Sequence, residues 1–291
     1  MTHLHKPLGP NCMPILIAMA TWFLCGCSSF LYQPTRQRYV DPAKLEHPPH
    51  EIHFHDVNGT DLVAWHFKPK SPAKARLVFF HGNAQNISSH FVSLYWLVDQ
   101  GYEFLIFDYP GYGISTGAPT PKNTIEAGVA ALQWLYGQQP ARPLAVFGQS
   151  LGGAVALRAA VQVKGQIPLC LVTVDSTFTS YKKAARDLLA THWATWLFQP
   201  LAGLTLSDRF APDKHIGKLA PIPLTVIHGE KDSIVHPRHG REVFEQAGQP
   251  KEFWLVPQGQ HIGVFNGANR EIFRARFLKS LNQHCSAKVT P

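Results

Sequence analysis

The amino-acid sequence predicts an α/β fold in which a mostly parallel central sheet is covered by helices on both faces. Short apolar runs alternate with segments of helical periodicity along most of the chain. The runs are apolar at nearly every position, which is typical of strands buried on both faces. The chain has 291 residues, of which 45% are hydrophobic, so it can fill the core that such a fold requires.

The expected elements follow one another from Glu51 to Leu281. A hairpin opens the series, with one strand at 51–57, a turn at Asn58-Gly59 and a second strand at 62–67. Further strands are expected at 77–80, 104–107, 144–147, 169–174, 224–227 and 253–256, and helices at 91–98, 124–136, 151–163, near Val243 and at 268–281. Strands that alternate with helices in this way form a parallel sheet.

One interval breaks the alternation. About fifty residues between Val174 and Leu224 contain no strand pattern but carry many apolar residues. Ligands of open α/β sheets bind at the carboxyl ends of the strands, where this interval would lie. We therefore expect a small helical cap at about 176–215 that shapes a substrate pocket, with extra core packing as the alternative.

The first thirty residues differ from the rest. Lys6 precedes an apolar run from Ile15 to Leu24, which is too short to cross a bilayer as a helix and is typical of a secretory signal. We expect a signal peptide at 1–26, a linker at 27–50, the main domain at 51–284 and a tail at 285–291.

The end of that signal, Leu24-Cys25-Gly26-Cys27, resembles a bacterial lipobox. The resemblance implies that Cys27 becomes the lipidated first residue and that several acyl chains anchor the protein to a membrane. Ser28 and Ser29 carry no negative charge that would indicate retention at the inner membrane. We expect a cell-envelope protein at the outer membrane, facing the periplasm. The alternatives are an ordinary signal peptide or an uncleaved anchor.

Charge and cysteine content restrict the partners. The net charge of +8 is spread along the chain without a basic run, so a nucleic-acid partner is not expected. Cys170 lies in an apolar strand and is expected to be a small buried hydrophobe, while Cys285 lies in a polar tail. A bridge between them is possible in an oxidising compartment but no spacing argument supports it. We expect a monomer.

The pentapeptide Gly148-Gln149-Ser150-Leu151-Gly152 follows an apolar strand and precedes a helix. A serine on such a turn has strained backbone dihedral angles, and its neighbours two positions away must lack side chains. The turn exposes the hydroxyl beside the amino end of the helix, where free N–H groups favour a developing oxyanion. The pattern predicts Ser150 as a nucleophile. The alternative is a serine helix cap.

Serine needs a base to act as a nucleophile. His261 follows the last expected strand on a glycine-flanked loop, and we predict it as the base. His81 and His228 also follow strands, but they belong to motifs that supply other parts of the site.

An acid must hold the imidazole in the correct tautomer. Asp232 follows the penultimate strand and gives the chain order Ser, Asp, His, so we predict it as the acid. Asp175 is the rival and Asp108 a more distant one.

An oxyanion hole needs two backbone donors. The N–H of Leu151, directly after the nucleophile, is one. The N–H of Asn83, after the strand that ends at Phe80, is the expected second.

These motifs resemble the α/β-hydrolase superfamily, closest to the Bem46-like and ABHD13/17-like branch of membrane-associated serine hydrolases. The motifs are His81-Gly82-Asn83, Phe107-Asp108-Tyr109-Pro110-Gly111-Tyr112-Gly113-Ile114-Ser115, the serine turn, His228-Gly229-Glu230-Lys231-Asp232 and Gln260-His261. The resemblance spans about Glu51 to Leu281. It implies a Ser/Asp/His triad, no metal, no cofactor, and hydrolysis of esters, thioesters or related acyl compounds.

Three other functions remain open at this point. The same residues would serve a serine aminopeptidase or an acyltransferase, in which the bond or the acceptor differs. A non-catalytic envelope lipoprotein is the third, although it would have little reason to keep all three triad elements. A histidine cluster that includes His53 and His55 could bind a metal, but we expect solvated side chains there.

Overall fold

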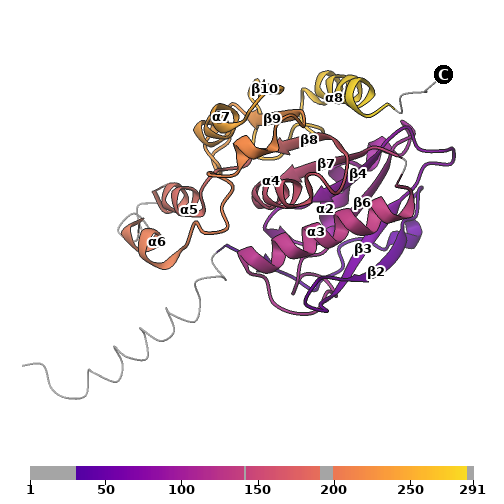
Figure 1. Ribbon diagram of the computed structural model, residues 1–291, viewed down its shortest axis with the longest axis horizontal. Coiled ribbons are helices and arrows are strands. Elements are labelled where there is room, and N and C mark those ends of the chain that lie inside the picture. The colour runs from indigo at the N-terminus through magenta and orange to yellow at the C-terminus, as the bar shows by residue number, and fades with distance from the viewer. Residues whose placement is uncertain (1–30, 141, 191–198, 287–291) are drawn as a thin grey trace, which may run out of the picture.

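The computed structural model describes residues 31–140, 142–190 and 199–286, and an eight-stranded sheet forms its centre (Figure 1). The strands are β2 (His50–His55), β3 (Asp61–Phe67), β4 (Arg76–Phe80), β6 (Glu103–Phe107), β7 (Leu144–Gln149), β8 (Leu169–Asp175), β9 (Leu224–Gly229) and β10 (Lys251–Val256). Their spatial order is β10-β9-β8-β7-β4-β6-β3-β2. The strands from β10 to β6 are parallel, and β3 pairs antiparallel with both β6 and β2. The predicted fold class is confirmed.

Helices cover both faces of this sheet. The helices α3 (Pro121–Gln138), α4 (Leu151–Val163) and α7 (Pro237–Gln246) pack on one face, and α2 (Ile87–His90) and α8 (Arg270–Cys285) pack on the other. Adjacent residues of a strand point to opposite faces. On β4, Phe80 accordingly belongs to the first core and Phe79 to the second. This explains why the strands are apolar at every position.

The helix predicted at 91–98 is wrong. The chain forms two 3₁₀ turns instead, Phe91–Ser93 and Tyr95–Leu97, directly after α2. Phe91, Leu94 and Leu97 are buried, and their spacing of three residues matches the three-residue turn of a 3₁₀ helix. The periodicity of apolar residues marked the correct buried face but the wrong helix type.

The described part of the segment predicted as a linker, residues 31–50, makes specific contacts with the domain. Tyr32 is 1% exposed and belongs to the core on the face of α3 and α4. The next two residues form β1 (Gln33–Pro34), which pairs in parallel with β5 (Ala84–Gln85). A 3₁₀ turn, Pro42–Lys44, follows before β2. The segment therefore packs against the domain.

Cys170 and Cys285 form a disulfide across 115 residues of sequence, with their Cα atoms 5.2 Å apart. The bridge that the sequence left open is thus present, and Cys285 belongs to a helix and not to a polar tail. The last helix, α8, continues to Cys285 and buries it completely against the core that it shares with β8. The sequence pattern underestimated the length of this helix.

The interval predicted as a cap contains α5 (Tyr181–Ala190) and α6 (Gln199–Thr205). These helices lie together at one end of the molecule, apart from the helices that cover the sheet (Figure 1). A 3₁₀ turn at Ile216–Leu219 leads to β9. Residues 191–198 of the predicted cap and the signal and lipobox motifs lie outside the described residues. Among the residues that the structure describes, no helix is sufficiently long and apolar to cross a membrane.

Candidate active site

Ser150 lies on a sharp turn between β7 and α4. Its φ is +52°, a value that residues with side chains rarely adopt. A Cβ atom on Gly152 would lie 2.2 Å from the carbonyl oxygens of both Phe80 and His81, and one on Gly148 would lie 2.8 Å from the Gly152 carbonyl oxygen. Only glycine fits at these two positions, as the sequence pattern predicted. The turn therefore packs tightly against the end of β4.

The structure brings the three predicted side chains together. His261 Nε2 lies 3.0 Å from Ser150 Oγ, and His261 Nδ1 lies 2.8 Å from Asp232 Oδ2. An ionised carboxylate can only accept hydrogen bonds, so Nδ1–H donates to Asp232 and Nε2 is free to accept from the serine hydroxyl. This is the hydrogen-bond pattern of a nucleophile, a base and an orienting acid.

The Asp232 carboxyl is buried but well supplied with partners. Its Oδ1 accepts hydrogen bonds from the backbone N–H groups of Ile234 and Val235 at 3.0 and 2.9 Å, and His228 Nε2 lies 3.4 Å from Oδ2. Burial alone would raise the pKa of Asp232, but the contacts with His228 and His261 and the Val235 N–H outweigh it and hold the pKa well below its ordinary value. Asp232 is therefore ionised across the physiological pH range.

Two residues that the sequence analysis did not assign hold the His261 loop. Ile262, next to His261, has a φ of +49°, and its N–H donates to Ser176 Oγ at 3.2 Å. Gln149 Nε2 lies 3.5 Å from the Ile262 carbonyl oxygen. Gln149 ends β7 and Ser176 follows β8, so both stand at strand ends on the same edge of the sheet. Their position at the carboxyl ends of predicted strands is the one feature of the sequence that could have identified Gln149 and Ser176.

Asp175, the rival acid, is close to the site but has other partners. Its carboxyl accepts hydrogen bonds from Gln149 Nε2 at 3.3 Å and from Ser176 Oγ at 3.2 Å, and its backbone carbonyl accepts one from the Ser150 N–H. Burial raises the pKa of Asp175 to about 6. Asp175 therefore supports the serine turn through its backbone carbonyl, and its carboxyl makes no hydrogen bond to His261.

The two rival bases are fully buried and bonded to backbone carbonyl groups. His81 Nδ1 lies 2.7 Å from the Gly82 oxygen, and His228 Nε2 lies 2.7 Å from the Val235 oxygen. Burial, together with the neighbouring His90, lowers the pKa of His81 well below its ordinary value. His81 is therefore neutral. The His81 ring holds the loop after β4, and the His228 ring holds the loop after β9, each through a backbone carbonyl.

The two predicted oxyanion residues share a cavity with the serine. Asn83, Ser150 and Leu151 line one side of a cavity of about 80 Å³. The other lining residues are apolar and come from the N-terminal segment, the cap and the loop after β9: Leu31, Phe178, Ala184, Ala185, Leu188, Ile234 and Val235. Leu151 begins α4, so its N–H is one of those at a helix start that have no partner within the helix.

No metal site accompanies these residues. In the described part of the chain, no group of three or more His, Cys, Asp or Glu side chains lies close enough to hold an ion. His53, from the histidine cluster near β2, lies 3.5 Å from Asp61 and is half exposed.

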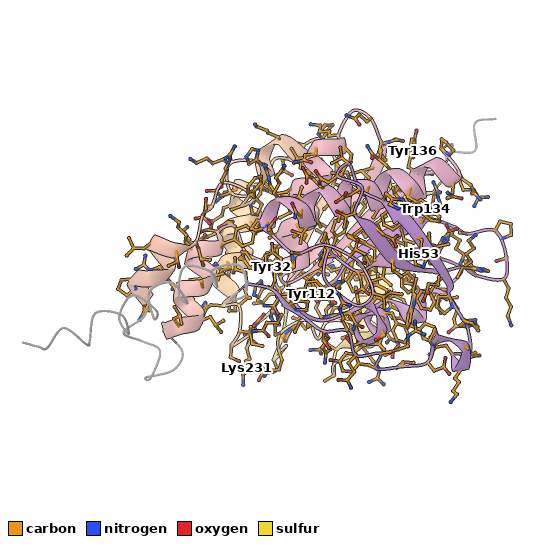
Figure 2. The ribbon with its side chains drawn as sticks, turned by 90° about the horizontal axis from the view of Figure 1, so that it is seen from below. Tyr32, His53, Tyr112, Trp134, Tyr136 and Lys231 are labelled. Carbon is orange, nitrogen blue, oxygen red and sulfur yellow. A yellow bond between two sulfur atoms is a disulfide. The ribbon has the colours of Figure 1, made fainter. Side chains whose placement is uncertain are left out.

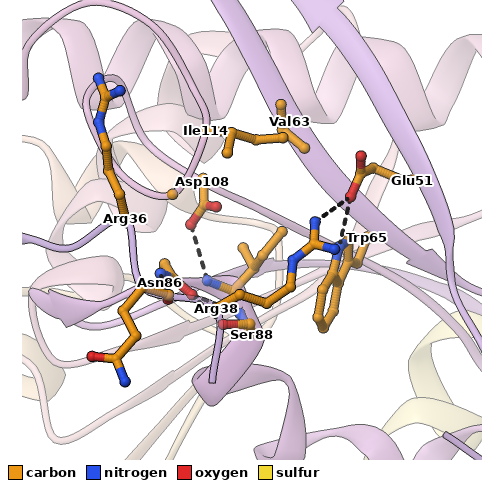
Figure 3. Close-up of a pocket in the computed structure, with 12 residues that line it drawn as sticks. Arg36, Arg38, Glu51, Val63, Trp65, Asn86, Ser88, Asp108 and Ile114 are labelled. Atoms are coloured by element: carbon orange, nitrogen blue, oxygen red, sulfur yellow. Dashed lines mark hydrogen bonds and ion pairs between the residues drawn. The ribbon is translucent and has the colours of Figure 1, made fainter. Parts of the chain in front are cut away.

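Asp108, the more distant rival acid, faces a different cavity. Its carboxyl is 2% exposed and accepts a hydrogen bond from the Ile87 N–H at 2.9 Å. Asp108 lines a small pocket of about 30 Å³. Arg36 and Asn86 also line this pocket (Figure 3). Burial raises the pKa of Asp108 to about 8, so the group is a neutral acid at pH 7.

Comparison with known proteins agrees with this architecture. Residues 71–211 match the family described as serine aminopeptidase S33, Hydrolase_4. The uncharacterized protein YfhR of Escherichia coli K12 is 29% identical over 257 residues, which are 86% of this chain and 85% of that protein. The uncharacterized protein Rv2307c of Mycobacterium tuberculosis H37Rv is 34% identical over 207 residues, or 70% and 69% of the two chains.

Among solved structures, the esterase Pf2001 of Pyrococcus furiosus superposes with a TM-score of 0.72 at 19% identity, covering 88% of this chain and 98% of that one. At that identity the likeness concerns the fold. The family match, the relatives and this likeness together identify the chain as a member of the α/β-hydrolase superfamily. The protein is a hydrolase of this fold.

The titration of Asp108 predicts a pH-dependent stability difference for the variant Asp108→Asn. The folded-state pKa is raised above the unfolded value of about 3.9, so unfolding releases a proton and wild-type stability falls as the pH rises between these values. Asparagine keeps an acceptor for the Ile87 N–H but cannot ionise. The stability of Asp108→Asn relative to wild type should rise with pH from about 4 to about 8, by at most about 1.4 kcal/mol per pH unit, and then stay constant. Urea unfolding at several pH values measures it. A difference that does not change with pH would contradict the prediction.

Proposed function

We propose that the protein is a serine hydrolase that cleaves carboxylic ester, thioester or related acyl bonds through an acyl-enzyme intermediate. The observation that carries this proposal is the pair of hydrogen bonds that link Ser150 to His261 and His261 to Asp232 at the edge of an apolar cavity. The proposed nucleophile, base and acid are these three residues, in that order.

In the first half of the reaction, His261 Nε2 takes the hydroxyl proton as Ser150 Oγ attacks the substrate carbonyl carbon. The imidazolium that forms lies against the ionised Asp232, which stabilises its charge. The backbone N–H groups of Asn83 and Leu151 donate to the oxyanion of the tetrahedral intermediate. His261 then gives its proton to the leaving group, and the acyl group remains on Ser150.

In the second half, water replaces the leaving group. His261 takes a proton from the water as its oxygen attacks the acyl carbon, and the same two N–H groups bind the second oxyanion. Collapse of this intermediate returns the proton to Ser150 Oγ and releases a carboxylic acid. Asp232 orients His261 in both halves and remains ionised throughout.

The cavity lining favours an apolar acyl group. Eight of its ten lining residues are apolar, and all of these except Leu151 lie on the N-terminal segment, the cap or the loop after β9. Apolar side chains increase the affinity for an apolar group of the substrate, but they do not select the bond that is cleaved. An aminopeptidase activity is the second candidate, because the matched family carries that description. An acyltransferase would use the same residues with a different acceptor.

The variant Ser150→Ala should lose hydrolysis of short p-nitrophenyl esters, with kcat reduced by about 10⁴-fold or more, because no other group forms the acyl-enzyme. Labelling by a fluorophosphonate probe should also disappear. A panel of esters, thioesters and aminoacyl amides, assayed with the wild type, identifies the preferred bond.

The matched control is Ser280→Ala, which removes a buried serine on α8 without touching the candidate site. Its activity and labelling should equal those of the wild type. Full labelling of Ser150→Ala would show that another residue is the nucleophile, and inactivity of the wild type on the whole panel would remove the proposed function.

A second pair of variants separates the two acids. In Asp232→Asn the amide oxygen stays with the backbone N–H groups of Ile234 and Val235, so the NH2 group takes the place of Oδ2 and faces His261 Nδ1. This group donates where the carboxylate accepted, which favours the wrong His261 tautomer, so kcat should fall by about 10⁴-fold. Asp175→Asn changes a carboxyl whose partners are Gln149 and Ser176, and kcat should fall less than tenfold. Steady-state kinetics of both proteins give the comparison. The opposite order of effects would assign the acid to Asp175.

We further propose that the protein is anchored in the cell envelope through lipidated Cys27, with the outer membrane facing the periplasm as the favoured site. The lipobox-like motif carries the proposal, and the Cys170–Cys285 disulfide supports an oxidising compartment. Leu31 lines the cavity and stands only four residues after Cys27. An extended chain of that length spans at most about 14 Å, so the cavity would lie close to the membrane surface.

The anchor is tested with Cys27→Ser and its neighbour Cys25→Ser in full-length protein. Metabolic labelling with an alkyne fatty acid and membrane association should both be lost in Cys27→Ser, because the acylated residue is absent. Cys25→Ser should retain both, since residue 25 lies in the removed signal. Equal labelling of the two variants would contradict lipidation at Cys27.

A further inference from the structure

The run Asp108-Tyr109-Pro110-Gly111-Tyr112-Gly113 follows β6, and the mechanism proposed above uses none of its side chains. The run is nevertheless deeply buried. Tyr109 and Tyr112 are both 0% exposed, although each carries a hydroxyl that needs a partner. Tyr112 lies near Tyr32 of the N-terminal segment, which is itself 1% exposed (Figure 2).

Both hydroxyls bind the loop that carries Asn83. Tyr109 OH donates to the backbone carbonyl oxygen of His81 at 3.0 Å, and Tyr112 OH donates to that of Asn83 at 2.5 Å. Carbonyl oxygens only accept, so the tyrosines must be protonated. Burial, the largest effect, raises the pKa of both hydroxyls above the ordinary value, which keeps them donors at every working pH.

Two further contacts hold the same loop. The carboxyl of Asp108 accepts the N–H of Ile87, at the far end of the loop. The N–H of Gln33, on β1, donates to the Asn83 carbonyl oxygen at 3.2 Å, so this oxygen has two donors. The run 108–113 and the N-terminal segment therefore both hold the loop 81–87 through hydrogen bonds.

These contacts restrict the peptide group that contains the proposed oxyanion donor. The Asn83 N–H shares a planar peptide group with the Gly82 carbonyl, which has His81 Nδ1 at 2.7 Å. The tyrosines bind the carbonyls directly before and after it, so three successive peptide groups each have a side-chain partner. The loop also borders the nucleophile, because a Cβ on Gly82 would lie 3.8 Å from Ser150 Cβ.

We infer that Tyr109 and Tyr112 are positioning residues that hold the loop 81–83 so that the Asn83 N–H points at the oxyanion. The inference rests on the proposed function and assigns a role to a motif which that function leaves unused. Neither tyrosine touches the substrate. Both act through the orientation of a backbone donor, whose contribution appears in the transition state and not in substrate binding.

The test replaces each tyrosine by phenylalanine, which removes one oxygen atom and keeps the ring. For Tyr112→Phe and Tyr109→Phe, kcat on a short p-nitrophenyl ester should fall at least tenfold while KM changes less than about threefold. The full loss of an oxyanion donor costs about 10²–10³-fold, so a misaligned donor should lose a fraction of that. The double variant should lose more than either single variant.

The control is Tyr102→Phe. Tyr102 is equally buried, at 1% exposure, but its hydroxyl donates to Asn282 on α8, far along the chain from the loop. The variant Tyr102→Phe therefore measures the effect of removing a buried hydroxyl that does not contact the loop. Its kcat should equal that of the wild type. Thermal unfolding of all variants shows whether each remains folded at the assay temperature.

A second measurement separates positioning from a general loss of structure. A trifluoromethyl ketone forms a tetrahedral adduct with an active serine, and the oxygen of this adduct occupies the oxyanion hole. The product carboxylate forms no such adduct, so its binding measures ground-state affinity. The ketone should bind Tyr112→Phe more weakly by the same factor as the loss in kcat/KM, with product inhibition unchanged. If either single variant unfolds, the other carries the same test.

The outcomes distinguish this inference from the proposed function. Wild-type activity that depends on Ser150, together with kcat values of both phenylalanine variants within twofold of Tyr102→Phe, would overturn the inference alone. Equal losses for the ketone and the product would also overturn it. A wild type without Ser150-dependent activity would overturn the proposed function and this inference with it.

Discussion

The strained backbone of Ser150 is the constraint on which the rest of the site depends. A non-glycine residue at positive φ costs roughly 1–3 kcal/mol and persists only where the surroundings hold it. Here the Ser150 N–H donates to the Asp175 carbonyl, and the turn packs against the end of β4 through glycines that admit no side chain. The interior of the sheet thus fixes the direction in which the hydroxyl points.

Sheet order explains how distant residues meet at that hydroxyl. Ser150, Asp232 and His261 follow β7, β9 and β10, which are parallel and lie near one another in one sheet, so their carboxyl ends share an edge. Burying the Asp232 carboxylate there would be unfavourable without partners. Two backbone N–H groups and two histidines supply them, and the same contacts hold the acid against the imidazole.

The sequence was sufficient for the fold and for the three side chains that the structure brings together, because Ser150, Asp232 and His261 each lie within five residues after an apolar strand. It was not sufficient for features that arise from contacts between distant segments. Gln149 and Ser176 support the His261 loop through hydrogen bonds across more than 80 residues. The Cys170–Cys285 bridge joins a strand to the last turn of a helix that the pattern ended too early. No local periodicity records such pairings.

The N-terminal segment is the clearest case of this kind, and it changes how the molecule is understood. Its composition predicted a linker, yet Leu31 lines the cavity, Tyr32 is buried in the core and the Gln33 N–H bonds the Asn83 carbonyl. Three consecutive residues thus contact the pocket, the core and the loop that carries Asn83. A segment held by these contacts is part of the domain and not a free connection to it. Residues 31–33 are therefore part of the structure that surrounds the loop beside Ser150.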